Sequence, residues 1–298
     1  MNPFPEPSED LAKEAAELAL ERGEILTWQP CPIALPKGDD LTFLLAQRLK
    51  SAVHKNISYH PGHDAVSGCV QHSNKQTERL HRLMRDFSRA ACFWLASLLP
   101  RYAQAWQPDR ASLRPEEEAT RKLRLSARND LLHFDAFPSR PTQGLRILRC
   151  YININPTDDR VWMTSDNFAK VLAKYGNAVG LPAKHTNTWV RRLAHRFLSM
   201  LTPNVAQRTD YDEFMLRLHH FLKSNDEFQE RAPRKLWHFQ PGTAWLFFSD
   251  SLSHAELRGQ YALEHSFFVA PHTLVMPDES PFRLLERMCA DSPMAKAA

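Results

Sequence analysis

Four strand-like segments in two blocks constrain the fold of this chain more than any other feature of its sequence. The first block holds "DLLHFDAF" at 130–137 and "LRILRCYININP" at 145–156, and the second holds "GTAWLFFSD" at 242–250 and "YALEHSFFV" at 261–269. Between the blocks, residues 165–225 return to a helical spacing of apolar residues. Runs of β-branched and aromatic residues bounded by turns favour strands, so the pattern predicts an antiparallel β core interrupted by a helical insertion.

Helical sequence also precedes and follows this core. The clearest apolar stripe runs from Leu80 to Leu98, and "SPFRLLERMC" at 280–289 predicts a terminal helix. We therefore predict a single α+β domain, residues 1–298, around a double-stranded β-helix core of the jelly-roll or cupin-like type. The expected parts are a mainly helical region at 1–110, the β core at 111–275 with its insertion at about 165–235, and a terminal helix and tail at 276–298.

Composition argues against several classes of protein. The five cysteines are scattered without CxxC spacing, which indicates free thiols in a reducing cytosol. The longest apolar stretch, at 90–99, is about half of a membrane span, and the N-terminus lacks the pattern of a signal peptide. No basic run or basic–aromatic patch supports nucleic-acid binding. We expect a cytoplasmic protein whose net charge of +4 is compatible with an anionic partner.

A pair of metal-ligating residue types stands in the first strand-like segment. His133 and Asp135 are two residues apart, so on a strand their side chains share one face. Two histidines and one carboxylate on one face of an octahedron are the ligands of non-haem Fe(II) oxygenases, which keep three positions for co-substrate and oxygen. The third ligand is expected near the end of a later core strand, where His254 follows "GTAWLFFSD". His265, inside the next strand, is the main alternative.

A 2-oxoglutarate-using enzyme also needs a cation for the distal carboxylate of that co-substrate. Many such enzymes place the cation ten or eleven residues after the last histidine, but those positions hold Glu264 and His265. Arg149, on the strand after the first two ligands, is the alternative, and it shares strand parity with Tyr151 and Asn153. We predict that Arg149 binds 2-oxoglutarate, helped by Asn153 or Tyr151.

Two stretches, "RNDLLHFDAFPSRPTQGLRILRCYININP" and "PGTAWLFFSDSLSHAELRGQYALEHSFFV", resemble the Kdo hydroxylase family, and the resemblance extends from about residue 40 to 288. It implies an Fe(II)- and 2-oxoglutarate-dependent dioxygenase with His133, Asp135 and His254 as the iron ligands. It also implies the reaction. O2 and 2-oxoglutarate are consumed, the outer Kdo sugar of Kdo-lipid A in the lipopolysaccharide inner core is hydroxylated at C3, and Ko, succinate and CO2 are formed.

The anionic substrate that the resemblance implies needs cations of its own. Arg140 directly follows the ligand segment and is the first expectation for the sugar carboxylate, with Arg128 as the second. Arg160 is expected on the surface. The mild positive charge would favour peripheral contact with the anionic inner membrane, and a homo-oligomer is left open.

Two other readings stay open at this point. One is an oxygenase of the same chemistry that acts on another small molecule or on a protein. The other is a non-catalytic, cupin-like sugar-binding module, which would need neither three spaced ligands nor an inward arginine. His265 stands where the family has glutamine, and Arg258 where it has a small residue, so the resemblance gives neither a role.

Overall fold

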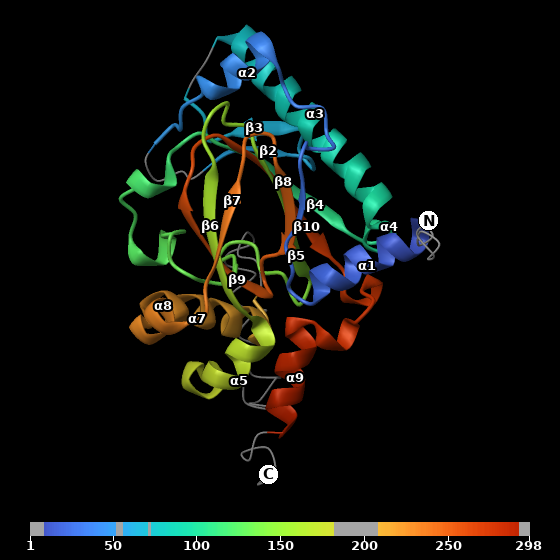
Figure 1. Ribbon diagram of the computed structural model, residues 1–298, viewed down its shortest axis with the longest axis vertical. Coiled ribbons are helices and arrows are strands. Elements are labelled where there is room, and N and C mark those ends of the chain that lie inside the picture. The colour runs from blue at the N-terminus through green and yellow to red at the C-terminus, as the bar shows by residue number, and fades with distance from the viewer. Residues whose placement is uncertain (1–8, 52–55, 71–72, 182–207, 292–298) are drawn as a thin grey trace, which may run out of the picture.

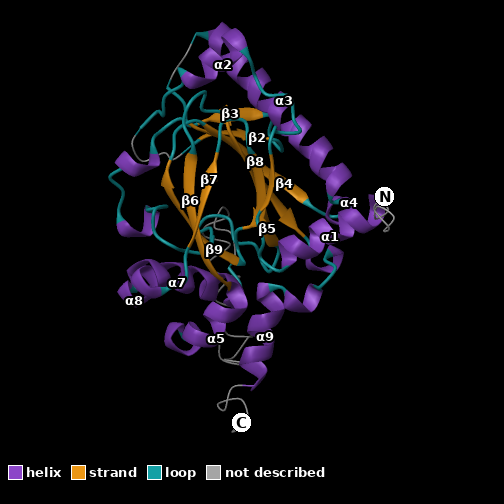
Figure 2. Ribbon diagram, viewed as in Figure 1, coloured by secondary structure: helices purple, strands orange, loops and turns teal. Residues whose placement is uncertain are grey.

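A computed structural model describes residues 9–51, 56–70, 73–181 and 208–291 of the chain. Two antiparallel sheets lie at its centre, with long helices beside one of them and a group of helices at one end (Figures 1 and 2). This arrangement confirms the predicted α+β class with a jelly-roll-type core, in which the two sheets stay open rather than closing into a barrel. Residues 182–207 of the predicted insertion lie outside the described residues.

The larger sheet has seven strands. In spatial order they are β1 (Leu26–Trp28), β8 (Ala244–Phe248), β5 (Arg146–Asn153), β10 (Ala262–Val269), β4 (Gln107–Arg114), β2 (Ile57–His60) and β3 (Ala65–Ser67). Strands β5, β8 and β10 fall inside the strand-like segments of the sequence. Strand β4 and the short strands β1 to β3 were not predicted from the sequence, because their residues lack a clear apolar alternation.

The smaller sheet has three strands in the order β7 (Lys235–Phe239), β6 (Arg160–Asn167) and β9 (Leu252–Arg258). The predicted strand at 130–137 is wrong as a continuous strand. Its backbone forms one antiparallel bridge, between His133 and His254, and the amide of Asp135 then turns away to donate to the carbonyl of Ser249. The segment is thus fixed beside β9 at the residues that matter for the site.

Aromatic side chains fill the space between the two sheets. Tyr151 and Trp245 of the larger sheet meet Trp162 and Phe239 of the smaller sheet in one buried cluster. The ring centroids of Phe239 and Trp245 lie 4.0 Å apart with parallel planes, and those of Tyr151 and Trp245 lie 5.2 Å apart. This packing holds the sheets face to face independently of any bound group.

Replacing Trp245 by alanine is expected to lower the free energy of unfolding by about 3–5 kcal/mol, because the change leaves a large cavity among fully buried rings. Urea unfolding followed by circular dichroism measures this. Phe93→Ala is the control, since the Phe93 side chain is 80% exposed and its loss should change stability by no more than about 0.5 kcal/mol. Equal effects of the two changes would contradict the aromatic core described above.

Helices cover the outer face of the larger sheet. The main one is α3 (Asn74–Leu98), which begins with a capping box at Ser73 and buries the apolar stripe predicted from the sequence. The others in this region are α1 (Glu9–Glu21), α2 (Gly38–Leu45) and α4 (Pro100–Ala103). Their buried residues form continuous clusters with β4, β5, β8 and β10.

A second group of helices packs behind the segment that carries His133. Helices α5 (Phe168–Val179), α7 (Asp210–Ser224) and α8 (Asp226–Arg231) lie between β6 and β7 in the chain, and α9 (Pro281–Asp291) closes the described part. Leu132 and Phe134 point into their common apolar cluster. Because Leu132 and Phe134 alternate with His133 and Asp135, burial of the first pair turns the second pair toward the opposite side.

Candidate metal centre

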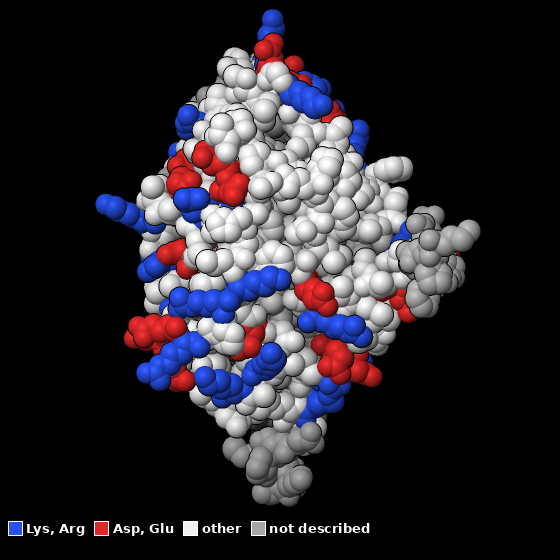
Figure 3. Space-filling model, viewed as in Figure 1, with Lys and Arg blue, Asp and Glu red and all other residues white. Residues whose placement is uncertain are grey.

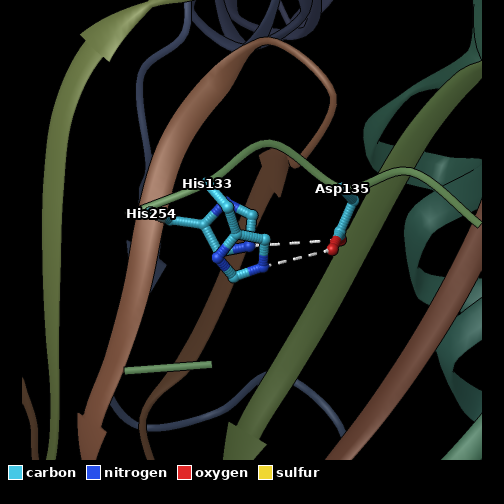
Figure 4. Close-up of side chains that lie close together, drawn as sticks. All are labelled: His133, Asp135 and His254. Carbon is cyan, nitrogen blue, oxygen red and sulfur yellow. Dashed lines mark ion pairs between the residues drawn. The ribbon is translucent and has the colours of Figure 1, made fainter. Parts of the chain in front are cut away.

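Three side chains from two distant segments of the sequence meet at the edge of the smaller sheet. Nε2 of His133 lies 3.7 Å from Oδ1 of Asp135, and Nε2 of His254 lies 4.0 Å from Oδ2 of the same carboxylate (Figure 4). One potential ligand atom from each of the three residues lies within 4.8 Å of the other two, and all three residues are buried. The structure therefore brings together the three residues that the sequence singled out.

The backbone fixes which ring nitrogen each histidine offers. Nδ1 of His133 lies 2.7 Å from the carbonyl oxygen of Leu131, and Nδ1 of His254 lies 3.0 Å from that of Leu252. A carbonyl only accepts, so each Nδ1 carries the proton and donates it. Each Nε2 is then left with a lone pair aimed at the centre of the group, which is the arrangement of a metal-binding histidine.

Protonation states also suit a cation. Burial lowers the pKa of both His133 and His254, which keeps the imidazoles neutral. Burial alone would raise the pKa of Asp135, but Arg149 and His133 together hold it well below its ordinary value. Oδ2 of Asp135 is buried and accepts no hydrogen bond from the described residues. Two neutral imidazoles and an ionised carboxylate fit a divalent transition metal.

The three residues line one cavity of about 680 Å³, a size typical of small-molecule sites. The lining contains more positive than negative side chains. Its cations are Arg110, Arg114, Arg124, Arg140, Arg149 and Lys223, and its acidic residues are Asp135 and Glu256. Arg110, Arg114, Arg124 and Lys223 were not predicted as site residues, because nothing in their local sequence distinguishes them from surface cations. The imbalance favours anionic ligands.

Arg149 stands directly beside the ligand group. Its Nε lies 2.8 Å from Oδ2 of Asp135, and one terminal nitrogen lies 2.6 Å from Oε1 of Glu264 and donates to the hydroxyl of Tyr151 at 2.7 Å. The contact with Asp135 is an ion pair without hydrogen-bond geometry. Arg149 thus lines the cavity next to the candidate metal ligands and already pairs with two carboxylates, and its contact with 2-oxoglutarate stays a prediction.

A buried network of charges continues from Arg149 into the space between the sheets. Arg114 contacts Glu118, Glu256 and Glu264, and Arg160 contacts Glu118 and Glu256. The expectation of a surface position for Arg160 is wrong, because its side chain is fully buried and also donates to the carbonyl of Gly259. Paired charges of both signs explain how this many ionised groups can stay buried.

The other residues predicted for co-substrate and substrate binding lie in different environments. The amide of Asn153 donates to the carbonyls of Asp158 and Phe239, and neither it nor Tyr151 lines the cavity. Arg128 pairs with Asp130 and is not part of the cavity lining, whereas Arg140 lines it. Arg140 pairs with Asp109, and its guanidinium lies 4.3 Å from the centroid of the Phe137 ring.

His265, the alternative third ligand, faces away from the ligand group. Its Nε2 lies 2.8 Å from the hydroxyl of Ser88 on α3, so this ring points into the helical layer. Burial lowers the pKa of His265 to about 4. The structure therefore leaves His254 as the histidine that completes the set with His133 and Asp135.

This burial predicts a pH-dependent stability. In the unfolded chain His265 takes up a proton near its ordinary pKa of about 6.5, whereas the folded chain resists protonation down to about 4. Stability from the neutral ring is therefore present above pH 6.5 and lost as the pH falls toward 4, by up to about 3 kcal/mol. The side chain of the His265→Gln variant cannot titrate. Between pH 7 and pH 4, its free energy of unfolding in urea should therefore fall by correspondingly less than that of the wild type. Parallel losses in both proteins would contradict this assignment.

Comparisons with known proteins agree with one another. Residues 5–292 match the model of a family described as 3-deoxy-D-manno-oct-2-ulosonic acid (Kdo) hydroxylase. A solved structure of the Kdo hydroxylase KdoO with α-ketoglutarate and Fe(III) is 31% identical, with a TM-score of 0.82 over 94% of this chain and 90% of that one.

Two further structures of that enzyme are similar to this chain. Its apo form is 30% identical, with a TM-score of 0.83 over 97% of this chain and 93% of the other. Its complex with succinate and Fe(III) is also 30% identical, with a TM-score of 0.82 over 95% and 92%. KdoO is described as a non-haem Fe(II) and α-ketoglutarate-dependent dioxygenase. No curated protein matches the chain.

Proposed function

This chain belongs to the Kdo hydroxylase family, and we propose from that premise that it hydroxylates a Kdo sugar as an Fe(II)- and 2-oxoglutarate-dependent dioxygenase. The observation that carries the proposal is the meeting of His133, Asp135 and His254 in a cavity lined mainly by cations. A sugar-binding module would not need three buried, unprotonated ligand atoms that converge on one point. The enzyme reading accounts for all of them.

His133, Asp135 and His254 would hold the iron, with O2 as the oxidant. Bound Fe(II) supplies the chemistry that couples oxidative decarboxylation of 2-oxoglutarate to hydroxylation of a second substrate. The protein's own contribution is orientation. The carbonyls of Leu131 and Leu252 hold the two imidazoles in one tautomer, and Arg149 keeps Asp135 ionised.

Arg149 is the proposed partner of the distal carboxylate of 2-oxoglutarate. It lines the cavity within ion-pair distance of Asp135, so a co-substrate at the iron would lie within its reach. We propose that Tyr151 acts indirectly. Its hydroxyl accepts hydrogen bonds from Arg149 and Arg114 and holds both guanidinium groups in place. Asn153 has no comparable contact with the cavity, so its predicted role in co-substrate binding has no support from the geometry.

The proposed acceptor is the outer Kdo sugar of Kdo-lipid A, hydroxylated at C3 to give Ko, succinate and CO2. A sugar acid on a phosphorylated lipid is strongly anionic, which the cation-rich cavity suits. Arg140 remains a proposed contact for the sugar carboxylate, whereas Arg128 has its own acidic partner outside the cavity lining.

Contact with the inner membrane from the cytoplasmic side is part of the same proposal, because the acceptor is a lipid. None of the helices in the described ranges has the length and apolar character needed to cross a membrane. Figure 3 shows Lys and Arg side chains interspersed with Asp and Glu over the lower half of one face. The net charge of +4 supports weak, transient electrostatic binding to an anionic membrane surface.

Succinate release tests the proposal. Purified protein with Fe(II), 2-oxoglutarate and oxygen should release succinate faster when a Kdo-bearing lipid A acceptor is added, and a chelator should stop it. Omission of iron or of 2-oxoglutarate gives the blanks. Acceptor-dependent release with an unrelated small molecule or protein, and none with the Kdo acceptor, would move the substrate assignment to that other class. No release with any acceptor would contradict the enzyme assignment.

A further inference from the structure

One wall of the cavity is formed by two paired strands. Strands β2 and β4 are antiparallel, with Ser58 opposite Ser112 and Tyr59 opposite Ala111, and Arg110 follows where the pairing of β4 with β10 becomes irregular between Ala111 and Pro108. Alternate residues of a strand share a face. Accordingly Asn56, Ser58 and His60 line the cavity together with Arg110 from β4. We refer to these four residues as the β2–β4 wall.

Arg110 differs from its neighbours in having no anionic partner. Arg114, Arg140 and Arg149 each pair with carboxylates inside the protein. Within the described ranges the side chain of Arg110 forms no hydrogen bond or ion pair, although it is half-buried. Burial removes part of the water around the Arg110 guanidinium without supplying a compensating negative charge, and this lowers its pKa. A partly desolvated cation in a ligand cavity is stabilised when an anion binds there.

The same wall also holds an unsatisfied acceptor. The side-chain oxygen of Asn56 is buried and receives no hydrogen bond from any described group. A buried amide oxygen without a donor costs free energy in the empty protein. A bound hydroxyl would remove that cost once the amide, whose oxygen has almost no surface open to the empty cavity, turns toward it. The wall therefore offers a cation for a carboxylate and an acceptor for a hydroxyl, which are the two groups that a sugar acid presents.

Resting on the proposed function, we propose that the β2–β4 wall is the subsite for the sugar acid of the acceptor, with Arg110 paired to its carboxylate and Asn56 accepting from one of its hydroxyls. This assigns the carboxylate to Arg110 ahead of Arg140. Arg140 already has Asp109 as its partner and Phe137 under its guanidinium, so it has less to gain from a further anion. Arg149 remains on the co-substrate side.

Arg110→Gln tests this subsite independently of the rest of the cavity. The change should raise the KM for a Kdo-bearing lipid A acceptor by about 10- to 100-fold, the loss expected for a hydrogen bond to a charged group. The affinity for 2-oxoglutarate, measured by calorimetry on the Co(II)-loaded protein, should change less than about threefold. The matched control is Arg89→Gln, which removes the same charge from the exposed side of α3, outside the cavity lining. Its acceptor KM should rise less than about threefold, since screened charges contribute little.

A modified acceptor identifies the group that Arg110 contacts. When the Kdo carboxylate is converted to a carboxamide, the KM of the wild type should rise by most of the factor that Arg110→Gln causes with the unmodified acceptor. The variant should have similar KM values for the two acceptors. Asn56→Ala should raise the KM for both acceptors alike, by about 2- to 10-fold, because it removes a contact to a hydroxyl. Arg110→Lys should recover part of the carboxylate preference.

The outcomes separate this inference from the function on which it rests. Wild-type turnover of the Kdo acceptor with an unchanged KM in Arg110→Gln would overturn the role of Arg110 and leave the proposed function intact. Equal rises of the acceptor KM in Arg110→Gln and Arg89→Gln would also overturn it, since the effect would then be one of overall charge. No wild-type turnover of any Kdo acceptor would overturn the proposed substrate and the subsite with it.

Discussion

Replacing His254 by alanine is expected to abolish turnover while leaving the protein folded. The side chain supplies one of three converging ligand atoms, and two remaining ligands cannot hold the metal in a defined geometry. Loss of a supporting contact alone costs 10- to 100-fold in metal affinity, so the loss of a ligand should cost at least about 100-fold. The protein should stay folded, because most of the aromatic core between the sheets lies outside the ligand group, although stability should fall since the buried His254 ring packs against Trp162 and Phe247. Calorimetry with Co(II) measures the metal affinity, and a succinate assay measures the turnover.

His238→Ala is the control for this experiment. His238 lies on β7 with its side chain 59% exposed, and it is not part of the cavity lining. The change should leave metal affinity and turnover within about twofold of the wild type, as is usual for surface substitutions. Full activity and full Co(II) affinity in His254→Ala would contradict the assignment of the metal centre to His133, Asp135 and His254.

Arg149→Ala should have the second-largest effect. It removes the cation proposed for 2-oxoglutarate, and a carboxylate buried without its cation costs several kcal/mol. We therefore expect the Kd for 2-oxoglutarate to rise by at least about 100-fold, and the acceptor KM to change far less. Calorimetry on the Co(II)-loaded protein gives the first quantity, and initial rates give the second.

The alanine variant also leaves Asp135 and Glu264 without their shared partner, so it could lose its fold. Arg149→Lys keeps the charge and loses the planar, forked donor, and should raise the 2-oxoglutarate Kd by about 10-fold in a folded protein. A rise in the acceptor KM alone, in either variant, would place Arg149 on the substrate side. The cation for 2-oxoglutarate would then be sought among Arg124, Arg140 and Lys223.

The ligand group was predictable from the sequence because strand parity and strand order constrain it. Parity put His133 and Asp135 on one face, and the next core strands restricted the third ligand to two histidines. The structure excludes His265 by turning it toward Ser88, and local sequence does not encode that choice. The ligand segment itself is no regular strand, yet one bridge to β9 suffices to align it.

The cavity wall and the buried charge network were not predictable in the same way. Strand β4 supplies both Arg110 and Arg114, and its sequence QPDRASLR has no apolar alternation to mark it as a core strand. Arg160 follows a turn and looks like a surface residue in sequence. Its burial depends on Glu118 and Glu256, which come from distant segments. Pairings of this kind arise from tertiary structure and leave no short-range pattern.

The most direct test of the account is the mass of the acceptor after reaction. Purified protein is incubated with Fe(II), 2-oxoglutarate, oxygen and Kdo-bearing lipid A, and the lipid is analysed by mass spectrometry with fragmentation of the sugar. The account predicts a gain of one oxygen atom, located at C3 of the outer Kdo sugar, with one succinate formed for each oxygen gained and no reaction in His254→Ala. An unchanged lipid, in a preparation that consumes 2-oxoglutarate with another acceptor, would contradict the central claim.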